Sequence, residues 1–314
     1  MAAYLALKDR PELSVRTGSV NAGHTVVYKG KIYKLRLTPS AFVNPSTQLR
    51  IAAGANIDLA VLRSEMDYLG VAGRLKVDSM ASVIEAHHIN EDRSDGFLKE
   101  VVGTTGSGVG PAIADRVRRR ARLAKDFEEL NGLTTDVSEE VYSTLDSGGT
   151  VHVEGSQGFY LSLYHGTYPF VTGRDTTTAA VLSEVGIGPK MVSEVVLVLK
   201  SYVTRVGEGP LPGELDSREA AARGWLETGT ITSRTRRTAP FDFKLARRAA
   251  KVNGATSIAV TKLDILFPEC SSAKAVESLS SRCLEFVRRI EMEVGVPVRY
   301  VSTGPDTSEI VLLG

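Results

Sequence analysis

Cysteine is scarce in this chain: Cys270 and Cys283 are the only two among 314 residues. They are too few for the disulfide framework of a small secreted domain and are consistent with a reducing compartment. They lie thirteen positions apart and form no CxxC pair, so we expect no cysteine-based metal site. The adjacent His87 and His88 have no further ligand at metal-binding spacing, and we expect this pair to be exposed and metal-free.

Excess charge and long apolar runs are absent as well. The formal net charge is +1, which gives no overall reason to expect a nucleic acid or a membrane as partner. The longest aliphatic run, Val195–Leu199, is far too short to span a bilayer, and the first ten residues lack a signal-peptide pattern. No GxGxxG follows a predicted strand, which disfavours a dinucleotide oxidoreductase. We expect a cytoplasmic globular protein that acts on small molecules.

Helical and strand patterns alternate along the chain. This order predicts an α/β fold with a doubly wound, mostly parallel central sheet flanked by helices. We expect one domain over residues 1–314, with a helical and loop subregion at about 58–130 inserted into the α/β core. The predicted helices cover Ala2–Lys8, Asp58–Gly70, Ile113–Leu130, Phe243–Val252 and Ala273–Val294. The predicted strands cover Leu13–Arg16, Thr150–Glu154, Glu194–Tyr202, Thr256–Thr261 and Val298–Val301, those at 194–202 and 256–261 being fully buried.

The stretch at 154–178 is the most informative in the sequence. It is too apolar for a disordered linker and too rich in glycine and hydroxyl residues for a core element. Its glycines let the backbone approach a ligand, while Gln157, Thr167 and Thr172 supply short donors and acceptors. The stretch follows a predicted strand, and ligands of open α/β sheets bind where strands end in such loops.

Four other segments have ligand-binding character. Residues 21–25 read Asn-Ala-Gly-His-Thr, and residues 103–111 place glycines and hydroxyls before a helix, where backbone N–H groups bind anions. Residues 229–237 form a basic, hydroxyl-rich loop whose arginine forks suit carboxylates. The fourth, residues 261–264, follows a buried strand, and its Asp264 can accept two N–H donors from guanine.

These strings resemble the signatures of the adenylosuccinate synthetase family. The order EGSQG…HGTYPFVT is similar to the family's nucleotide-binding signature, NAGHTV matches in full, and the GTT motif matches with slightly shifted glycines. The resemblance runs from about Ala3 to Leu313 and is closest to short archaeal-type members. It implies a P-loop-type core and a ligase that joins L-aspartate to IMP through a 6-phosphoryl intermediate, using GTP and Mg²⁺. The product would be adenylosuccinate, in AMP biosynthesis.

The resemblance also implies residue roles. His24 and Gln157 would be catalytic, and Gly23 would offer a carbonyl to magnesium. Arg119 would reach the nucleotide of a partner subunit, which implies a homodimer. The purine nucleotide would be bound by Asn21, Thr104, Thr105, Arg119, Gln157, Leu161, Thr172, Val206 and Arg234.

Two further sets complete the implied site. Aspartate would be bound by Thr230, Ile231, Thr232, Arg234 and Arg236, and the nucleoside triphosphate by Thr25, Arg236, Lys262, Asp264, Ser302 and Gly304. The chain departs from the family's GRRRR run, since Ser233 stands for a glycine and Thr235 for an arginine.

One family feature is absent from the printed sequence. Members begin with a strand and a GDEGKGK loop that carries a catalytic aspartate, and no such string occurs here. The fold is therefore expected without that first strand and phosphate loop. Two alternatives stay open: a phage-type branch that makes 2-aminoadenylosuccinate from dGMP with ATP or dATP, and a non-catalytic purine-nucleotide-binding protein.

Overall fold

The computed structural model describes residues 1–229 and 234–314. Its larger sheet is all parallel and has the order β8 (Thr134–Thr135), β6 (Leu75–Asp78), β4 (Gln48–Ile51), β1 (Leu13–Arg16), β9 (Val151–Glu154). The α/β fold with a parallel central sheet is thereby confirmed.

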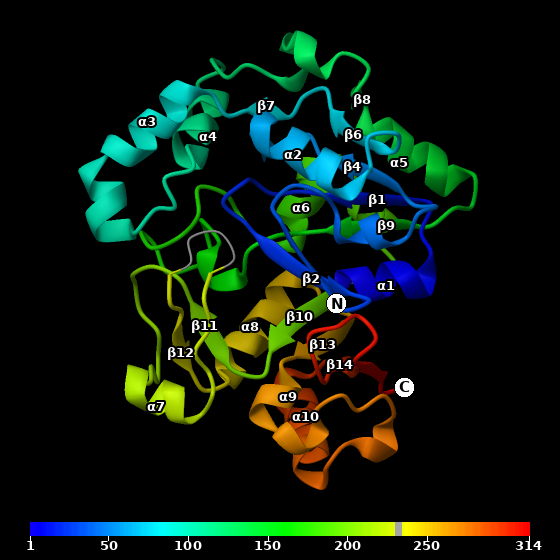
Figure 1. Ribbon diagram of the computed structural model, residues 1–314, viewed down its shortest axis with the longest axis vertical. Coiled ribbons are helices and arrows are strands. Elements are labelled where there is room, and N and C mark those ends of the chain that lie inside the picture. The colour runs from blue at the N-terminus through cyan, green and yellow to red at the C-terminus, as the bar shows by residue number, and fades with distance from the viewer. Residues whose placement is uncertain (230–233) are drawn as a thin grey trace.

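A second sheet has the order β10 (Val196–Lys200), β13 (Ser257–Thr261), β14 (Val298–Ser302), β15 (Ile310–Leu312). Its first three strands are parallel, and β15 is antiparallel to β14. Figure 1 shows the two sheets one above the other. Within the described ranges, β9 and β10 lie at the sheet edges that face the same cavity, and they are not paired with each other. Among the described residues, the predicted parallel strands are therefore divided between two sheets.

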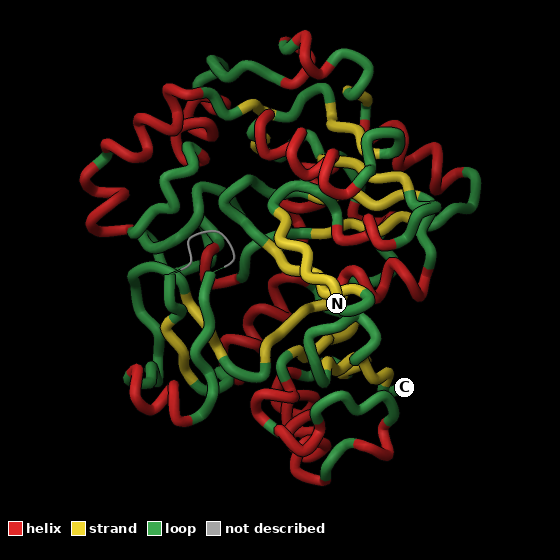
Figure 2. Tube along the Cα trace, viewed as in Figure 1, coloured by secondary structure: helices red, strands yellow, loops and turns green. Residues whose placement is uncertain are grey.

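Helices cover both faces of the larger sheet. Leu62 and Met66 of α2 (Leu59–Leu69) join one core with Leu49 and Ile51 of β4. On the opposite face, α5 (Val137–Asp146) and α6 (Thr178–Val185) pack against β1. Figure 2 shows helices surrounding the yellow strands. This two-sided cover is the doubly wound arrangement that alternating helices and strands produce.

Helix α1 (Ala2–Asp9) packs on both sheets. Ala3 and Ala6 lie in the core of the larger sheet, while Tyr4 and Leu5 pack against Tyr300 of β14. The outer face of the second sheet is covered by α8 (Phe243–Asn253) and α10 (Ser281–Val294). The short α9 (Leu263–Leu266) follows β13. Helix α1 thus joins the two sheets, as do the hydrogen bonds from Thr178 of α6 to Asn253 of α8.

Smaller elements surround this frame. The hairpin β2 (His24–Tyr28) and β3 (Lys31–Leu35) follows β1, and β5 (Asn56–Ile57) pairs with β7 (Ser82–Val83). The helices α3 (Ala86–Ser94) and α4 (Val109–Val117) pack together. The pair β11 (Val203–Arg205) and β12 (Arg237–Ala239) lies near α7 (Ser217–Ala222) (Figure 1).

Three sequence expectations are corrected. The helix expected at 113–130 is α4, which ends at Val117 because Arg119 takes a left-handed φ of 62°. The helix expected at 273–294 begins only at Ser281, where Ser280 caps it. The strand expected to be fully buried at 194–202 is half-buried, and Val198 is 51% exposed because it faces the cavity between the sheets.

Other expectations are confirmed. The helix predicted from Asp58 is α2, and the Asp58 carboxylate accepts a hydrogen bond from the backbone N–H of Val61, as an N-cap does. Helix α8, the buried strand β13 and strand β14 lie where the pattern places them. In the described parts of the chain, no helix has the length and apolar character needed to cross a bilayer.

Candidate active site

A cavity of about 1570 Å³ lies between the two sheets. The edge strands β9 and β10 line it, together with loops that follow β1, β9 and β11. It therefore opens at the carboxyl ends of parallel strands, where α/β proteins bind ligands. Many sequence-predicted residues line it: Asn21, Gly23, His24, Thr104, Thr105, Gln157, Leu161, Thr172, Val206 and Arg236.

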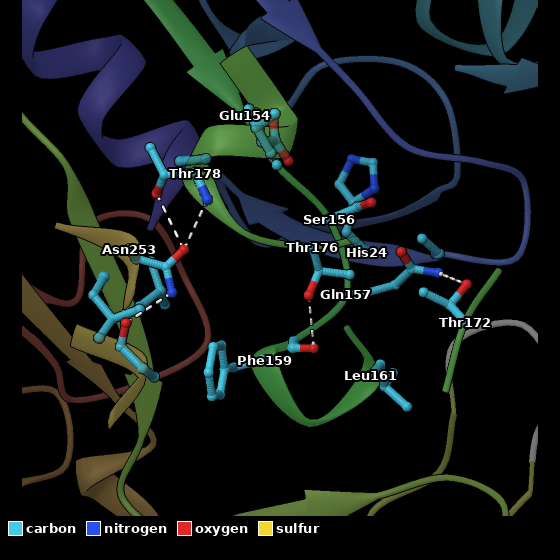
Figure 3. Close-up of a pocket in the computed structure, with 18 of the residues that line it drawn as sticks. His24, Glu154, Ser156, Gln157, Phe159, Leu161, Thr172, Thr176, Thr178 and Asn253 are labelled. Atoms are coloured by element: carbon cyan, nitrogen blue, oxygen red, sulfur yellow. Dashed lines mark hydrogen bonds between the residues drawn. The ribbon is translucent and has the colours of Figure 1, made fainter. Parts of the chain in front are cut away.

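Gln157 is held in a constrained conformation in this cavity. Its φ is +65°, a value that non-glycine residues rarely adopt. Its amide nitrogen donates to the Thr172 hydroxyl at 2.9 Å, drawn as a dashed line in Figure 3, and to the Asn21 side-chain oxygen at 3.4 Å. Its amide oxygen is buried and has no partner among the described residues. That oxygen is consequently available to a ligand donor.

His24 faces the same cavity from the start of β2 (Figure 3). Both ring nitrogens are buried, and neither makes a hydrogen bond to any described residue. Burial, reinforced by the positive charge of Arg16, lowers the pKa of His24 to about 3, while Glu154 opposes the shift. The ring is thus neutral near pH 7, with one N–H donor and one acceptor to offer.

The loop at 103–108 is fastened by a carboxylate that the sequence did not single out. Asp92 of α3 is 2% exposed and accepts from the Thr104 hydroxyl at 2.7 Å and from the Gly108 N–H at 2.8 Å. Thr104 in turn accepts from the Gly106 N–H at 3.2 Å. The Thr104 side chain is therefore fixed at the cavity wall, and Thr105 beside it is exposed.

Arg234 and Arg236 approach the cavity differently. The Arg234 guanidinium donates to the carbonyl oxygens of Gly103 and Thr104, at 3.0 and 3.2 Å, in a smaller pocket beside the cavity. Arg236 lines the cavity itself, 3.7 Å from the Glu227 carboxylate. The predicted aspartate ligands Thr230, Ile231 and Thr232 lie outside the described residues.

The residues expected to bind the triphosphate form a second group. These residues lie at or just after the carboxyl ends of β13 and β14 and do not line the cavity: Lys262, Asp264, Ser302 and Gly304. Burial raises the pKa of the Asp264 carboxyl. Thr25, exposed on β2, is near this group through the hairpin, whose Val27 forms a bridge with Asp306. Arg119 is exposed at the end of α4 and lies away from the cavity lining.

Of the pair His87 and His88, His87 is exposed as expected, but His88 is not. His88 is buried, at 1% exposure, and its Nε2 lies 3.4 Å from the Asp115 carboxylate. The Nδ1 of His88 accepts from the Glu85 N–H at 3.0 Å, so the proton of a neutral ring is on Nε2. No lone pair of this ring is then free for a metal, although His87, His88 and Asp115 lie close together.

Sequence reasoning also missed four charged residues: Arg16, Glu154 and Lys200 line the cavity, and Glu227 pairs with Lys200. Arg16 and Glu154 are the last residues of β1 and β9. A charged residue at the end of an otherwise apolar strand was the available signal, because that end is where α/β sites form. Glu227 gave no local signal, since its partners come from three separate segments.

Comparison with known proteins accounts for this arrangement. The sequence profile described as adenylosuccinate synthetase matches residues 6–129 and 121–269. The adenylosuccinate synthetase of Methanosphaera stadtmanae is 44% identical over 312 residues, covering 98% of this chain and 92% of that protein. The one from Pyrococcus horikoshii is 46% identical over 315 residues, covering 99% of this chain and 93% of its own.

Two solved structures share the fold. One is a fully ligated adenylosuccinate synthetase from Plasmodium falciparum, with a TM-score of 0.92 and 22% identity, covering 100% of this chain and 96% of that one. The other is the succinoaminodeoxyadenylate synthetase of cyanophage S-2L bound to dGMP and dATP, with a TM-score of 0.81 and 27% identity, covering 99% and 90%. With near-complete coverage at such identity to the curated relatives, the chain belongs to the adenylosuccinate synthetase family, whose members are ligases that form a carbon–nitrogen bond.

Proposed function

We propose that the chain joins L-aspartate to IMP at the expense of GTP. N1 of IMP loses its proton to a base or to solvent, and O6 attacks the γ-phosphorus of GTP, so that the bond to the β-phosphate oxygen breaks and GDP leaves. The amine of aspartate then attacks C6, phosphate departs with the former O6, and the amine loses a proton. The product is adenylosuccinate.

One observation carries the proposal. The ring nitrogens of His24 and the amide oxygen of Gln157 are buried polar atoms without partners among the described residues, and both side chains line one cavity. Buried polar groups in proteins are nearly always hydrogen-bonded, so atoms left without partners indicate a ligand. His24 and Gln157 are the two residues that the family resemblance makes catalytic.

The chemistry assigned to these residues is positioning and charge stabilisation. The neutral His24 ring donates its N–H to an oxygen of the transferred phosphoryl group. Gln157, fixed by Thr172 and Asn21, holds the purine so that O6 faces that group. A misplacement of about 1 Å in such an array lowers the rate about 100-fold. The constrained backbone of Gln157 would keep its side chain in the position that the reaction needs.

We further propose that magnesium binds beside Gly23. This ion is usually held by few protein oxygens together with phosphates and water, and a single cavity-lining backbone carbonyl suits that mode. When bound, it neutralises charge on the phosphates. Arg236 and Arg234 bind the carboxylates of aspartate, and Lys262 and Asp264 bind the guanine base.

The space between β9 and β10 supports one more proposal. Both strands present an unpaired edge to the cavity, and Val151, Val153, Val196 and Val198 line it. Another parallel strand fits between β9 and β10, because the apolar side chains of these two strands would flank it. Strands of parallel sheets are usually apolar and covered on both faces. We propose that this position accepts a strand that leads through a phosphate loop into α1.

IMP is proposed ahead of dGMP because the curated adenylosuccinate synthetases compared are 43–47% identical to this chain, whereas the phage enzyme bound to dGMP is 27% identical. The phage enzyme keeps dGMP with ATP or dATP as the second candidate, since it covers 99% of the chain. A non-catalytic nucleotide-binding protein is the third.

The test measures aspartate-dependent phosphate release with IMP and GTP. It compares the chain as printed with a version extended at its N-terminus by a strand and a GDEGKGK loop of the kind that the family resemblance implies. We expect turnover with that extension and none with a scrambled extension of equal length. Turnover with dGMP and dATP but not with IMP would assign the phage-type reaction. Nucleotide binding without phosphate release in either version would refute the ligase proposal.

A further inference from the structure

Arg16 and Glu154 form an ion pair at the point where the two signature loops begin. They are the last residues of β1 and β9, which are adjacent parallel strands paired in register, Arg16 opposite Glu154. The Arg16 side chain is 4% exposed and the Glu154 side chain 15%. The pair is therefore built into the sheet rather than placed on the surface.

Each member of the pair also holds a neighbouring segment. Arg16 donates through Nη2 to the carbonyl oxygen of Ala22 at 3.1 Å and through Nε to that of Arg36 at 3.3 Å. Glu154 accepts from the Ser40 N–H at 2.8 Å and from the Ser40 hydroxyl at 2.9 Å. The segment before His24, the end of the β2–β3 hairpin and the turn at Ser40 are thus all fixed to one pair.

Ala22 lies two residues before His24, and Glu154 lies three residues before Gln157. Figure 3 shows Glu154, His24 and Gln157 around the same pocket. Close to His24 and Gln157 themselves, the two loops are joined by a long hydrogen bond of 3.4 Å from Gln157 to Asn21, while Arg174 donates to the Thr17 hydroxyl at 2.9 Å where the loop after β1 begins. A single long neutral hydrogen bond is weak, whereas hydrogen bonds to charged groups are about twice as strong.

We propose that the Arg16–Glu154 pair is a positioning unit that sets where His24 lies relative to Gln157. Its effect on rate rests on the function proposed above. Its effect on the position of the loop at 17–24 is independent of that function, because this effect follows from the hydrogen bonds alone.

The charge state of the pair agrees with this role. Burial by itself would raise the pKa of Glu154, but Arg16, His24 and Ser40 together lower it, so the carboxylate is ionised. A buried ion pair is weak evidence for stability, because an apolar pair of the same volume is often as stable. A test of the positioning role therefore needs, as a control, a second buried arginine–glutamate pair that lies outside the cavity.

The same sheet supplies that control. Arg50 of β4 is 6% exposed and pairs with Glu140 of α5 at 2.6 Å. Arg50 also donates to the backbone carbonyl oxygens of Leu49 and Arg74, at 2.7 and 2.9 Å. The chemistry is matched, but neither Arg50 nor Glu140 lines the cavity.

The experiment compares Glu154→Gln with Glu140→Gln. Hydrogen exchange, measured by mass spectrometry on peptides covering residues 17–25, reports the loop directly. We expect exchange there to be about tenfold faster in E154Q and unchanged in E140Q, since a neutral amide holds Arg16 less strongly. In the version that turns over, kcat should fall about 10–100-fold in E154Q, with the KM for IMP within about twofold.

Unchanged exchange in E154Q would overturn the proposal, as would equal losses of kcat in both variants. If E154Q does not fold, Arg16→Lys keeps the positive charge but its single nitrogen cannot reach Glu154 and the Ala22 carbonyl oxygen together, and the same local increase in exchange is expected. Faster exchange without turnover in any version, wild type included, would support the positioning unit and reject the ligase function.

Discussion

Lys200, the last residue of β10, has its ammonium group 2.7 Å from the Glu227 carboxylate, which also accepts from the Tyr202 hydroxyl at 2.6 Å. Arg236 and Lys262 lie 3.7 and 3.8 Å from the same carboxylate. The single negative charge of Glu227 thus faces three positive charges. The positive charge that it does not balance can attract an anionic substrate. Arg236 and Lys200 are both on the cavity wall, where that charge attracts phosphates or carboxylates.

Lys200 gives a prediction about pH. Burial lowers its pKa to about 8, Glu227 opposes this, and Arg236 and Lys262 add to it. Lys200 is therefore charged below about pH 8 and loses its charge above it. We expect the affinity for an anionic substrate to fall between about pH 7 and pH 9, and calorimetric titrations across that range measure it.

The control for this prediction is Lys200→Arg, which keeps a charge throughout the range because arginine does not deprotonate there. Substrate groups titrate alike in both proteins, so the difference between the two pH profiles isolates Lys200. Identical profiles would contradict the assignment.

At the scale of the element, the loop before α4 depends on one glycine. Gly108 has a φ of +75°, and a Cβ there would lie 2.8 Å from the backbone nitrogen of Ile89 in α3. Its N–H is one of the two donors to Asp92. The close packing of α3 against α4 therefore requires a residue without a side chain at this position.

Gly108→Ala should lower stability by about 1–3 kcal/mol, because it combines an unfavourable φ with a backbone clash. The matched control is Gly110→Ala in the first turn of α4, where a Cβ meets nothing within 4 Å. That change should be neutral or stabilising by up to about 1 kcal/mol. Chemical denaturation of both variants checks the contrast, and equal effects would contradict it.

Elements also show where sequence patterns stop being informative. The basic run after Ile113 keeps helical propensity, yet α4 ends at Val117 because Arg119 adopts a left-handed backbone. No residue type in this run predicts the turn. The turn forms because the chain returns toward β7, where Ser82 and Leu123 form a bridge. By contrast, α2 has Asp58 as a local cap, and its start was predictable.

At the scale of the whole molecule, the frame consists of two sheets and the helix α1 that packs on both. His24 and Gln157 line the cavity where the sheets face each other, while Arg119 is exposed at the end of α4. We propose a homodimer in which Arg119 serves the site of the partner subunit.

Complementation tests this dimer. His24→Ala and Arg119→Ala should each abolish most activity in the version that turns over. A mixture should regain up to about a quarter of it, because random pairing makes half the molecules mixed dimers with one intact site each. Arg118→Ala, at the exposed neighbouring position, should stay active and serve as the control. No recovery in the mixture would place Arg119 in its own site or outside catalysis.

Sequence patterns were enough to predict the fold class, the helices and strands with strong periodicity, and the loops that carry His24, Thr104 and Gln157. They could do so because those signals are local: period, caps and glycine-rich strings. The tertiary structure alone decided that Arg16 pairs with Glu154, that Glu227 gathers three cations and that His88 is buried. Those contacts join residues from distant segments, and only the packing of both sheets around one cavity brings them together.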